Sequence, residues 1–92
     1  MEATPDRHHA SDPAISKRLK RSHGHLRKVI EMIEEGRPCA EIAQQLYAVE
    51  KAVQQAKKTL IHDRIDHCLS NPAEHDDPQA LVTEFREISK YL

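Results

Sequence analysis

A long run without glycine or proline, which begins after Pro38 and ends near Leu69, is the strongest constraint on the fold of this 92-residue chain. Its apolar residues recur every three or four positions, which is the spacing of one continuous helix with a narrow apolar stripe. The stripe consists of Ile42, Leu46, Val49, Val53, Ala56 and Leu60. A long helix with so narrow a stripe is typical of a coiled-coil seam, so two copies of this helix are expected to pack together.

The only two cysteines, Cys39 and Cys68, lie near the two ends of this predicted helix. Their spacing corresponds to eight helical turns plus about 20°, so both residues lie on one face, about 43 Å apart along the axis. They therefore cannot meet within one chain. If two copies pack antiparallel across a two-fold axis, Cys39 of one subunit lies opposite Cys68 of the other. The spacing predicts a dimer with two equivalent two-cysteine sites.

Two shorter helices are expected on either side of the long one. Asp-Pro pairs at 12–13 and 77–78 are typical helix starts, because Asp caps free amides and Pro is tolerated at the first helical position. After the first pair, apolar residues keep helical spacing as far as Gly36, the expected stop. The first helix is thus predicted over about 13–35, and a third follows the second pair.

The expected fold is all-α, with three helices per subunit and no strand. Residues 1–11 are polar and are expected to form a flexible arm, and residues 12–92 a single helical domain. A chain this short buries a modest fraction of its surface, so oligomerisation would help to stabilise it. Neither a membrane-spanning apolar run nor a signal-peptide core is visible, and a cytoplasmic protein with reduced thiols is expected.

The net charge of −1 conceals a basic segment. Between Lys17 and Lys28 there are six cations and no acid: Lys17, Arg18, Lys20, Arg21, Arg27 and Lys28. A charge run is usually a solvated helix face. A local positive field of this density, however, attracts phosphates whatever the total charge, and indicates a polyanionic partner. The candidates for phosphate contacts are Arg18, Lys20, Arg21 and Arg27, with His25 near them.

Both cysteines are expected to be reactive. Arg64 lies one turn before Cys68 on the same helix face, and a guanidinium stabilises a thiolate. Cys39 follows Pro38 in the first turn of the long helix, where the helix dipole favours an anion, and Arg37 is near. Two nucleophilic thiols suit reaction with sulfur electrophiles or oxidants, with one cysteine attacking and the other resolving.

Metal binding is the main alternative. Two cysteines and a histidine would make a soft site for Cu(I) or Zn(II). His67 adjoins Cys68 but projects about 80° from the direction of Cys39, and His62 about 140°. Other histidines that would have to swing toward the thiols are His8, His9, His23 and His25.

Two further alternatives are a small thiol enzyme, which no CxxC motif or general base supports, and a helical oligomerisation module with incidental cysteines.

Three segments resemble one known family. RLKRSHGHLRKVIEMIEEGRPC at 18–39, LYAVEKA at 46–52 and LIHDRIDHCL at 60–69 are similar to the copper-sensitive operon repressor family, CsoR, with its relatives RcnR, FrmR and CstR. The similarity covers about 17–69 without a gap between the cysteines. It implies an all-helical dimer that pairs into a homotetramer and represses transcription without a helix-turn-helix. It also implies that operator DNA is released when an effector occupies the cysteine site.

The departures from this family indicate a branch. Copper-sensing members carry Cys, His and Cys, and Arg64 stands here at the histidine position. The resemblance is closest to the persulfide-sensing branch, CstR, which also lacks that histidine and keeps both cysteines. FrmR-like sensors lack the second cysteine. RcnR-like sensors have histidines at the positions that Arg64 and Cys68 occupy in this chain. Glu84 falls near an outer-shell carboxylate of copper sensors, and Glu50 occupies a position where several members carry arginine.

The leading hypothesis from the sequence is a cytoplasmic DNA-binding repressor, not an enzyme. It would respond to persulfide or polysulfide through a switch between Cys39 and Cys68 of facing subunits, and would need no cofactor. The alternative is a Cu(I)- or other metal-responsive repressor that uses the same cysteines with His67. Operator double-stranded DNA and further copies of the chain are the expected partners, and a membrane is not.

Overall fold

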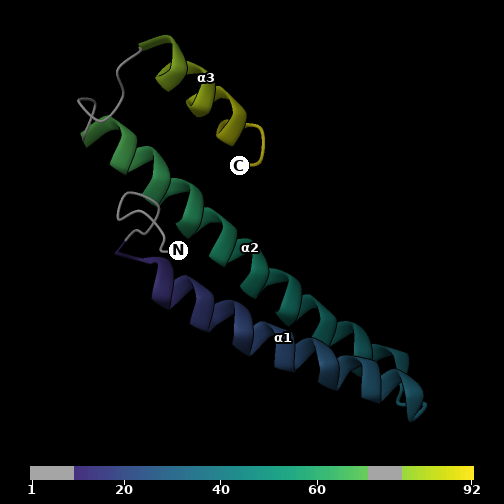
Figure 1. Cartoon of the computed structure of the whole chain (residues 1–92). Helices are drawn as coiled ribbons and strands as arrows, with labels where there is room; N and C mark the ends of the chain where they lie inside the picture. Colours follow the sequence, from purple (N-terminus) through teal and green to yellow (C-terminus); the bar gives the residue numbers. More distant parts are fainter. Residues whose placement is uncertain (1–9, 71–77) are drawn as a thin grey trace. The chain divides into compact units, whose positions relative to one another are not determined.

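The structure, a computed structural model, describes residues 10–70 and 78–92 (Figure 1). Within these ranges the regular elements are three helices, and no strand is present. The helices are α1 (Asp12–Glu34), α2 (Cys39–Ser70) and α3 (Pro78–Ser89). The predicted all-α fold is confirmed, and each predicted boundary lies within about one residue of the observed one. Most of the predicted arm, and the polar segment 71–77 that is predicted to link the second and third helices, lie outside the described residues.

The connection between α1 and α2 is a tight turn built around Gly36. Gly36 has a φ of 73°, in the left-handed region that glycine adopts without a Cβ clash. Its amide donates to the carbonyl of Ile33 at 3.1 Å, and the amide of Arg37 donates to that of Met32 at 3.0 Å. These two bonds form a Schellman motif, which satisfies the carbonyls left free at the end of α1. Gly36 is therefore the stop that the sequence predicted.

Helix α2 begins directly after this turn. The amides of Glu41 and Ile42 donate to the carbonyl of Pro38 at 3.0 and 3.1 Å, so Pro38 is the cap and Cys39 the first helical residue. From there α2 continues for 32 residues without a break. The long central helix expected from the sequence is thus confirmed.

The chain forms two compact units, one of residues 13–56 and one whose described part is 10–12, 57–70 and 78–92. In the first unit α1 lies alongside the beginning of α2 (Figure 1), and His25 Nε2 is 2.7 Å from Oε1 of Gln45 across the two helices. The buried apolar residues of the first unit are Ile15, Val29, Met32, Val49 and Ala56. The core of this unit is therefore aliphatic, in keeping with a chain that has only three aromatic residues.

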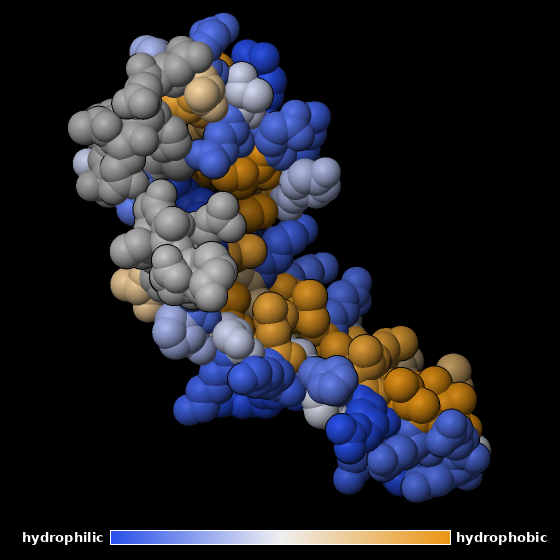
Figure 2. All heavy atoms as spheres, viewed as in Figure 1, coloured by the Kyte–Doolittle hydropathy of each residue, from blue (hydrophilic) through white to orange (hydrophobic). Residues whose placement is uncertain are grey.

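An apolar band remains exposed on the first unit. It consists of Leu19, Leu26, Ile30 and Ile33 of α1 with Leu46 and Val53 of α2. These six side chains are between 40% and 56% exposed, and Figure 2 shows orange surface over the α1–α2 hairpin. On a helical projection the four α1 members fall within about 60° of one another, beside the buried face. A contiguous apolar surface of this kind is typical of a protein–protein interface.

Candidate functional site

Cys39 has a free, exposed thiol at the first position of α2. The amides at a helix start have no partner inside the helix, so this end carries a partial positive charge that favours an anion. Arg37, which the sequence associates with this thiol, donates Nη2 to Oε1 of Glu41 at 2.6 Å. Both side chains of that ion pair are about half exposed, at 48% and 47%. The contact that the structure shows for the Arg37 guanidinium is therefore with a carboxylate.

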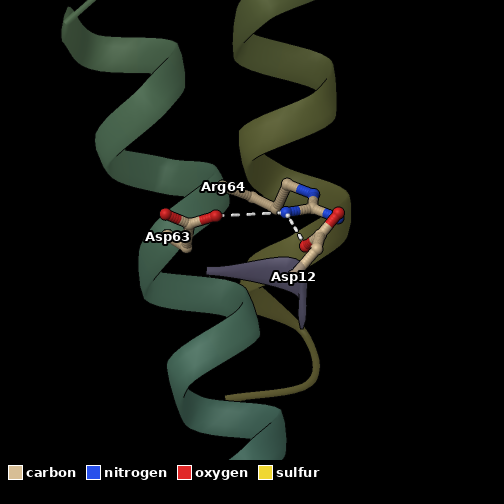
Figure 3. A network of polar contacts seen from close by, with 3 residues as sticks. All are labelled: Asp12, Asp63 and Arg64. Carbon is tan, nitrogen blue, oxygen red and sulfur yellow. Dashed lines mark hydrogen bonds and ion pairs between the residues drawn. The ribbon is translucent and has the colours of Figure 1, made fainter. Parts of the chain in front are cut away.

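Arg64 lies between two carboxylates, one from each side (Figure 3). Its Nη1 donates to Oδ1 of Asp12 at 3.1 Å and to Oδ2 of Asp63 at 3.2 Å. Its Nη2 donates to the second oxygen of Asp12 at 3.4 Å. The three side chains are 27% to 29% exposed, so this cluster is partly withdrawn from water. The guanidinium thus holds Asp12 in a two-pronged ion pair.

The Arg64 cluster has two consequences for the site. A guanidinium is always charged and has no lone pair to offer, so it cannot act as a metal ligand. Asp12 is also the first residue of α1, so the ion pair fixes the start of α1 to α2. No sequence signal pointed to this contact, because the two residues are 52 positions apart. The effect of Arg64 on the thiolate of Cys68 stays a prediction.

The thiol pair supplies a soft donor set, whose fit to a metal depends on a third ligand. Cys68 belongs to the last turns of α2, but its thiol lies outside what the structure describes. Among the described side chains, no three from His, Cys, Asp and Glu converge on a point where a metal would be held. His67 is half-buried on α2 and Glu84 is exposed on α3. Two thiols are soft ligands that suit Cu(I), and the guanidinium of Arg64 can add no ligand to them.

A cationic face covers one side of α1. We define it as Lys17, Lys20, Arg21, Arg27 and Lys28, all of which are exposed. On a helical projection these residues span about 120°, away from the buried face, and Arg18 lies about 60° beyond the edge. His25 is half-buried and bonded to Gln45, which gives it a role in joining α1 to α2. Lys17 and Lys28, which belong to the same basic run, are thus exposed beside the residues predicted to contact phosphates, and those contacts stay a prediction.

The fold and its surfaces define a small helical protein that presents a cationic helix, an apolar band and an exposed thiol, with no catalytic constellation among the described residues. Residues 11–92 match the family described as metal-sensitive transcriptional repressor. The chain belongs to this family, the CsoR family, whose members repress transcription and are not enzymes. Membership implies DNA binding and oligomerisation.

Individual relatives support the assignment. The chain is 30% identical over 78 residues to the copper-sensing transcriptional repressor CsoR of Mycobacterium ulcerans, covering 85% of this chain and 67% of that protein. It is 30% identical over 76 residues to CsoR of Bacillus subtilis, covering 83% and 75%. Its structure is similar to that of the nickel-responsive transcriptional regulator InrS, with a TM-score of 0.77, 28% identity, and coverage of 92% and 97%. In the part of the chain that the structure describes, no helix is long and apolar enough to span a membrane.

Proposed function

We propose that this repressor releases its operator when reactive sulfur species join Cys39 of one subunit to Cys68 of the facing subunit. The observation that carries the proposal is the Arg64 cluster. Arg64 occupies the position at which copper sensors of the family are expected to carry a histidine ligand, and Asp12 and Asp63 hold its guanidinium there. Two cysteines without that histidine retain thiol chemistry while losing a metal ligand.

The chemistry requires only a persulfide donor, RSSH. One cysteine thiolate attacks the outer sulfur of the donor, the S–S bond of the donor breaks, and RS⁻ leaves with the electron pair and takes up a proton. The cysteine is now a persulfide. The thiolate of the second cysteine then attacks the inner sulfur of this persulfide and expels HS⁻, which is protonated. In sum, two protein thiols and RSSH give one disulfide, RSH and H₂S.

Exposure and helix geometry support the two-subunit arrangement. The thiol of Cys39 is exposed, so a donor molecule has access to it. Cys39 and Cys68 belong to one unbroken helix, so helix length keeps them apart within one chain. The apolar band, with Leu46 and Val53 of α2 as members, offers the surface over which a second copy would pack. A crosslink across that interface would strain the dimer and shift the DNA-binding surfaces out of register.

The cationic face is the surface that we assign to DNA, together with Arg18 beside it. Exposed lysine and arginine side chains contact phosphates, which set the position of a protein on DNA more than its sequence preference. His25 holds α1 against α2 through Gln45 and thus supports this surface from behind.

The test combines mass spectrometry with DNA binding. Reduced protein is treated with a sulfane sulfur donor, and its mass and operator affinity are measured before and after. We expect a crosslinked dimer on a non-reducing gel and weaker binding, both reversed by a thiol reductant. The Cys39→Ser variant is expected to keep its affinity after treatment. A full response in that variant would refute the proposal.

Copper is the second candidate effector, because curated relatives are named copper-sensing repressors. The two thiols would supply soft ligands for Cu(I), and His67 or another histidine would have to complete the site. Tight, stoichiometric Cu(I) binding that abolishes operator binding under strictly reducing conditions would favour this candidate. The Arg64→Lys variant is a control for the Cu(I)-binding measurement, since lysine keeps the positive charge of Arg64 and still supplies no metal ligand at pH 7.

A further inference from the structure

Gly24 lies in the interior of α1, although no contact among the described residues of the subunit requires a glycine there. Its φ is not positive, since Gly36 is the positive-φ glycine of the chain. A Cβ placed on Gly24 would meet no atom within 4 Å, so packing does not exclude a side chain. Glycine in the middle of a helix nevertheless lowers stability relative to alanine. A glycine that lowers the stability of a helix and is not required by the packing of that helix is a candidate for contact with a partner.

The surroundings of Gly24 identify the chemistry of that partner. Side chains three and four positions away along a helix are the surface neighbours of a residue. For Gly24 these four neighbours are Lys20, Arg21, Arg27 and Lys28, which are all exposed. Gly24 is therefore a patch of bare backbone enclosed by four cations, at the centre of the cationic face.

We infer that Gly24 is the floor of a phosphate seat, in which a backbone phosphate of DNA lies against α1 and the four surrounding cations contact it and its neighbours. The absence of a Cβ lets the phosphate approach the helix backbone closely. A side chain at this position would hold the phosphate away and lengthen its contacts with Arg21 and Arg27. This inference rests on the assignment of DNA to the cationic face and is independent of the effector.

The decisive variant is Gly24→Ala, because it moves stability and DNA affinity in opposite directions. Alanine is the better helix former and has open space here, so the melting temperature is expected to rise by a few degrees. Affinity for a short duplex of arbitrary sequence is expected to fall by about fivefold, because the phosphate is displaced. Gly24→Leu is expected to weaken binding further at unchanged helix content.

One lysine variant tests the cations around Gly24, and a second lysine variant serves as its control. Lys28→Gln is expected to reduce the slope of log affinity against log salt by about one. Lys90→Gln is the matched control, since Lys90 is an exposed lysine in the other unit, paired with Glu87. It is expected to leave the slope unchanged.

Each outcome decides the inference. Wild-type affinity in Gly24→Ala would overturn it, and so would a lower melting temperature, because the fold itself would then require the glycine. If the wild type does not bind the duplex, the DNA assignment and the seat fail together. All measurements use reduced protein without a sulfur reagent, so failure of the persulfide response leaves the seat standing.

Discussion

Removing the ion pair between Asp12 and Arg64 is expected to loosen the start of α1 and to lower stability by a measurable amount. Exposed salt bridges contribute about 0.2 to 1 kcal/mol, whereas removal of one partner of a fully buried pair costs about 3 to 5 kcal/mol. Arg64 and Asp12 are 29% and 28% exposed, and the guanidinium contacts both oxygens of Asp12. We therefore expect a coupling free energy of about 1 kcal/mol between the two side chains, near the upper end for exposed pairs.

A double-mutant cycle measures this coupling directly. The free energies of unfolding of the wild type, Asp12→Asn, Arg64→Gln and the double variant are compared in urea, which adds no ionic screening. Asparagine has nearly the size of aspartate and keeps a polar side chain at the start of α1, so the first variant removes chiefly the charge. All four proteins are measured at one protomer concentration, because assembly contributes to apparent stability.

The exposed pair Lys90–Glu87 provides an internal standard. Its side chains are 57% and 62% exposed, so its coupling in a parallel cycle is expected to stay below about 0.5 kcal/mol. If the Asp12–Arg64 coupling does not exceed that of the standard, the cluster does not fix the start of α1 to α2.

Three further predictions concern other features. Arg64→His is expected to tighten Cu(I) binding by at least tenfold in a chelator competition, because an imidazole joins two soft ligands; equal affinity in the variant would argue against the role given to position 64. Leu46→Glu places a charge in the apolar band and is expected to shift the protein toward monomer in sedimentation, whereas the exposed Gln44→Glu should not; an unchanged oligomer would remove the band from the interface. Gly36→Ala is expected to destabilise by about 1 kcal/mol in urea, because a Cβ is strained at this positive φ, and a stabilised variant would contradict the turn described for it.

The helices could be predicted from the sequence because each carried its own local signal. Gly36 marks the end of α1, proline marks the starts of α2 and α3, and the three-four spacing of the stripe fixes the identity of the long helix. These signals act over a few residues, so they can be read from one chain. The exposure of the cationic face agrees with its charge run, because such a run is usually a solvated helix face.

The contacts of the arginines were not predictable in the same way. The ion pair of Arg37 with Glu41, one turn along the chain, was not foreseen, and the effect of Arg37 on the thiol of Cys39 stays a prediction. The partner of Arg64 comes from the start of another helix, and such a contact depends on tertiary packing, which a periodicity argument does not contain. The choice between sulfur and metal depends on a second subunit and on the side chain of Cys68, so it remains a prediction.

The unbroken course of α2 makes the relative position of its residues sensitive to insertions and deletions in the sequence. Inserting or deleting one residue anywhere between Cys39 and Cys68 would turn one thiol by about 100° relative to the other and shift it by about 1.5 Å along the axis. A loop would absorb such a change, but a continuous helix passes it on in full. If Cys39 meets Cys68 of a facing subunit as proposed, an insertion or deletion in α2 would misalign the two thiols, whereas a substitution at an exposed position would leave their spacing unchanged.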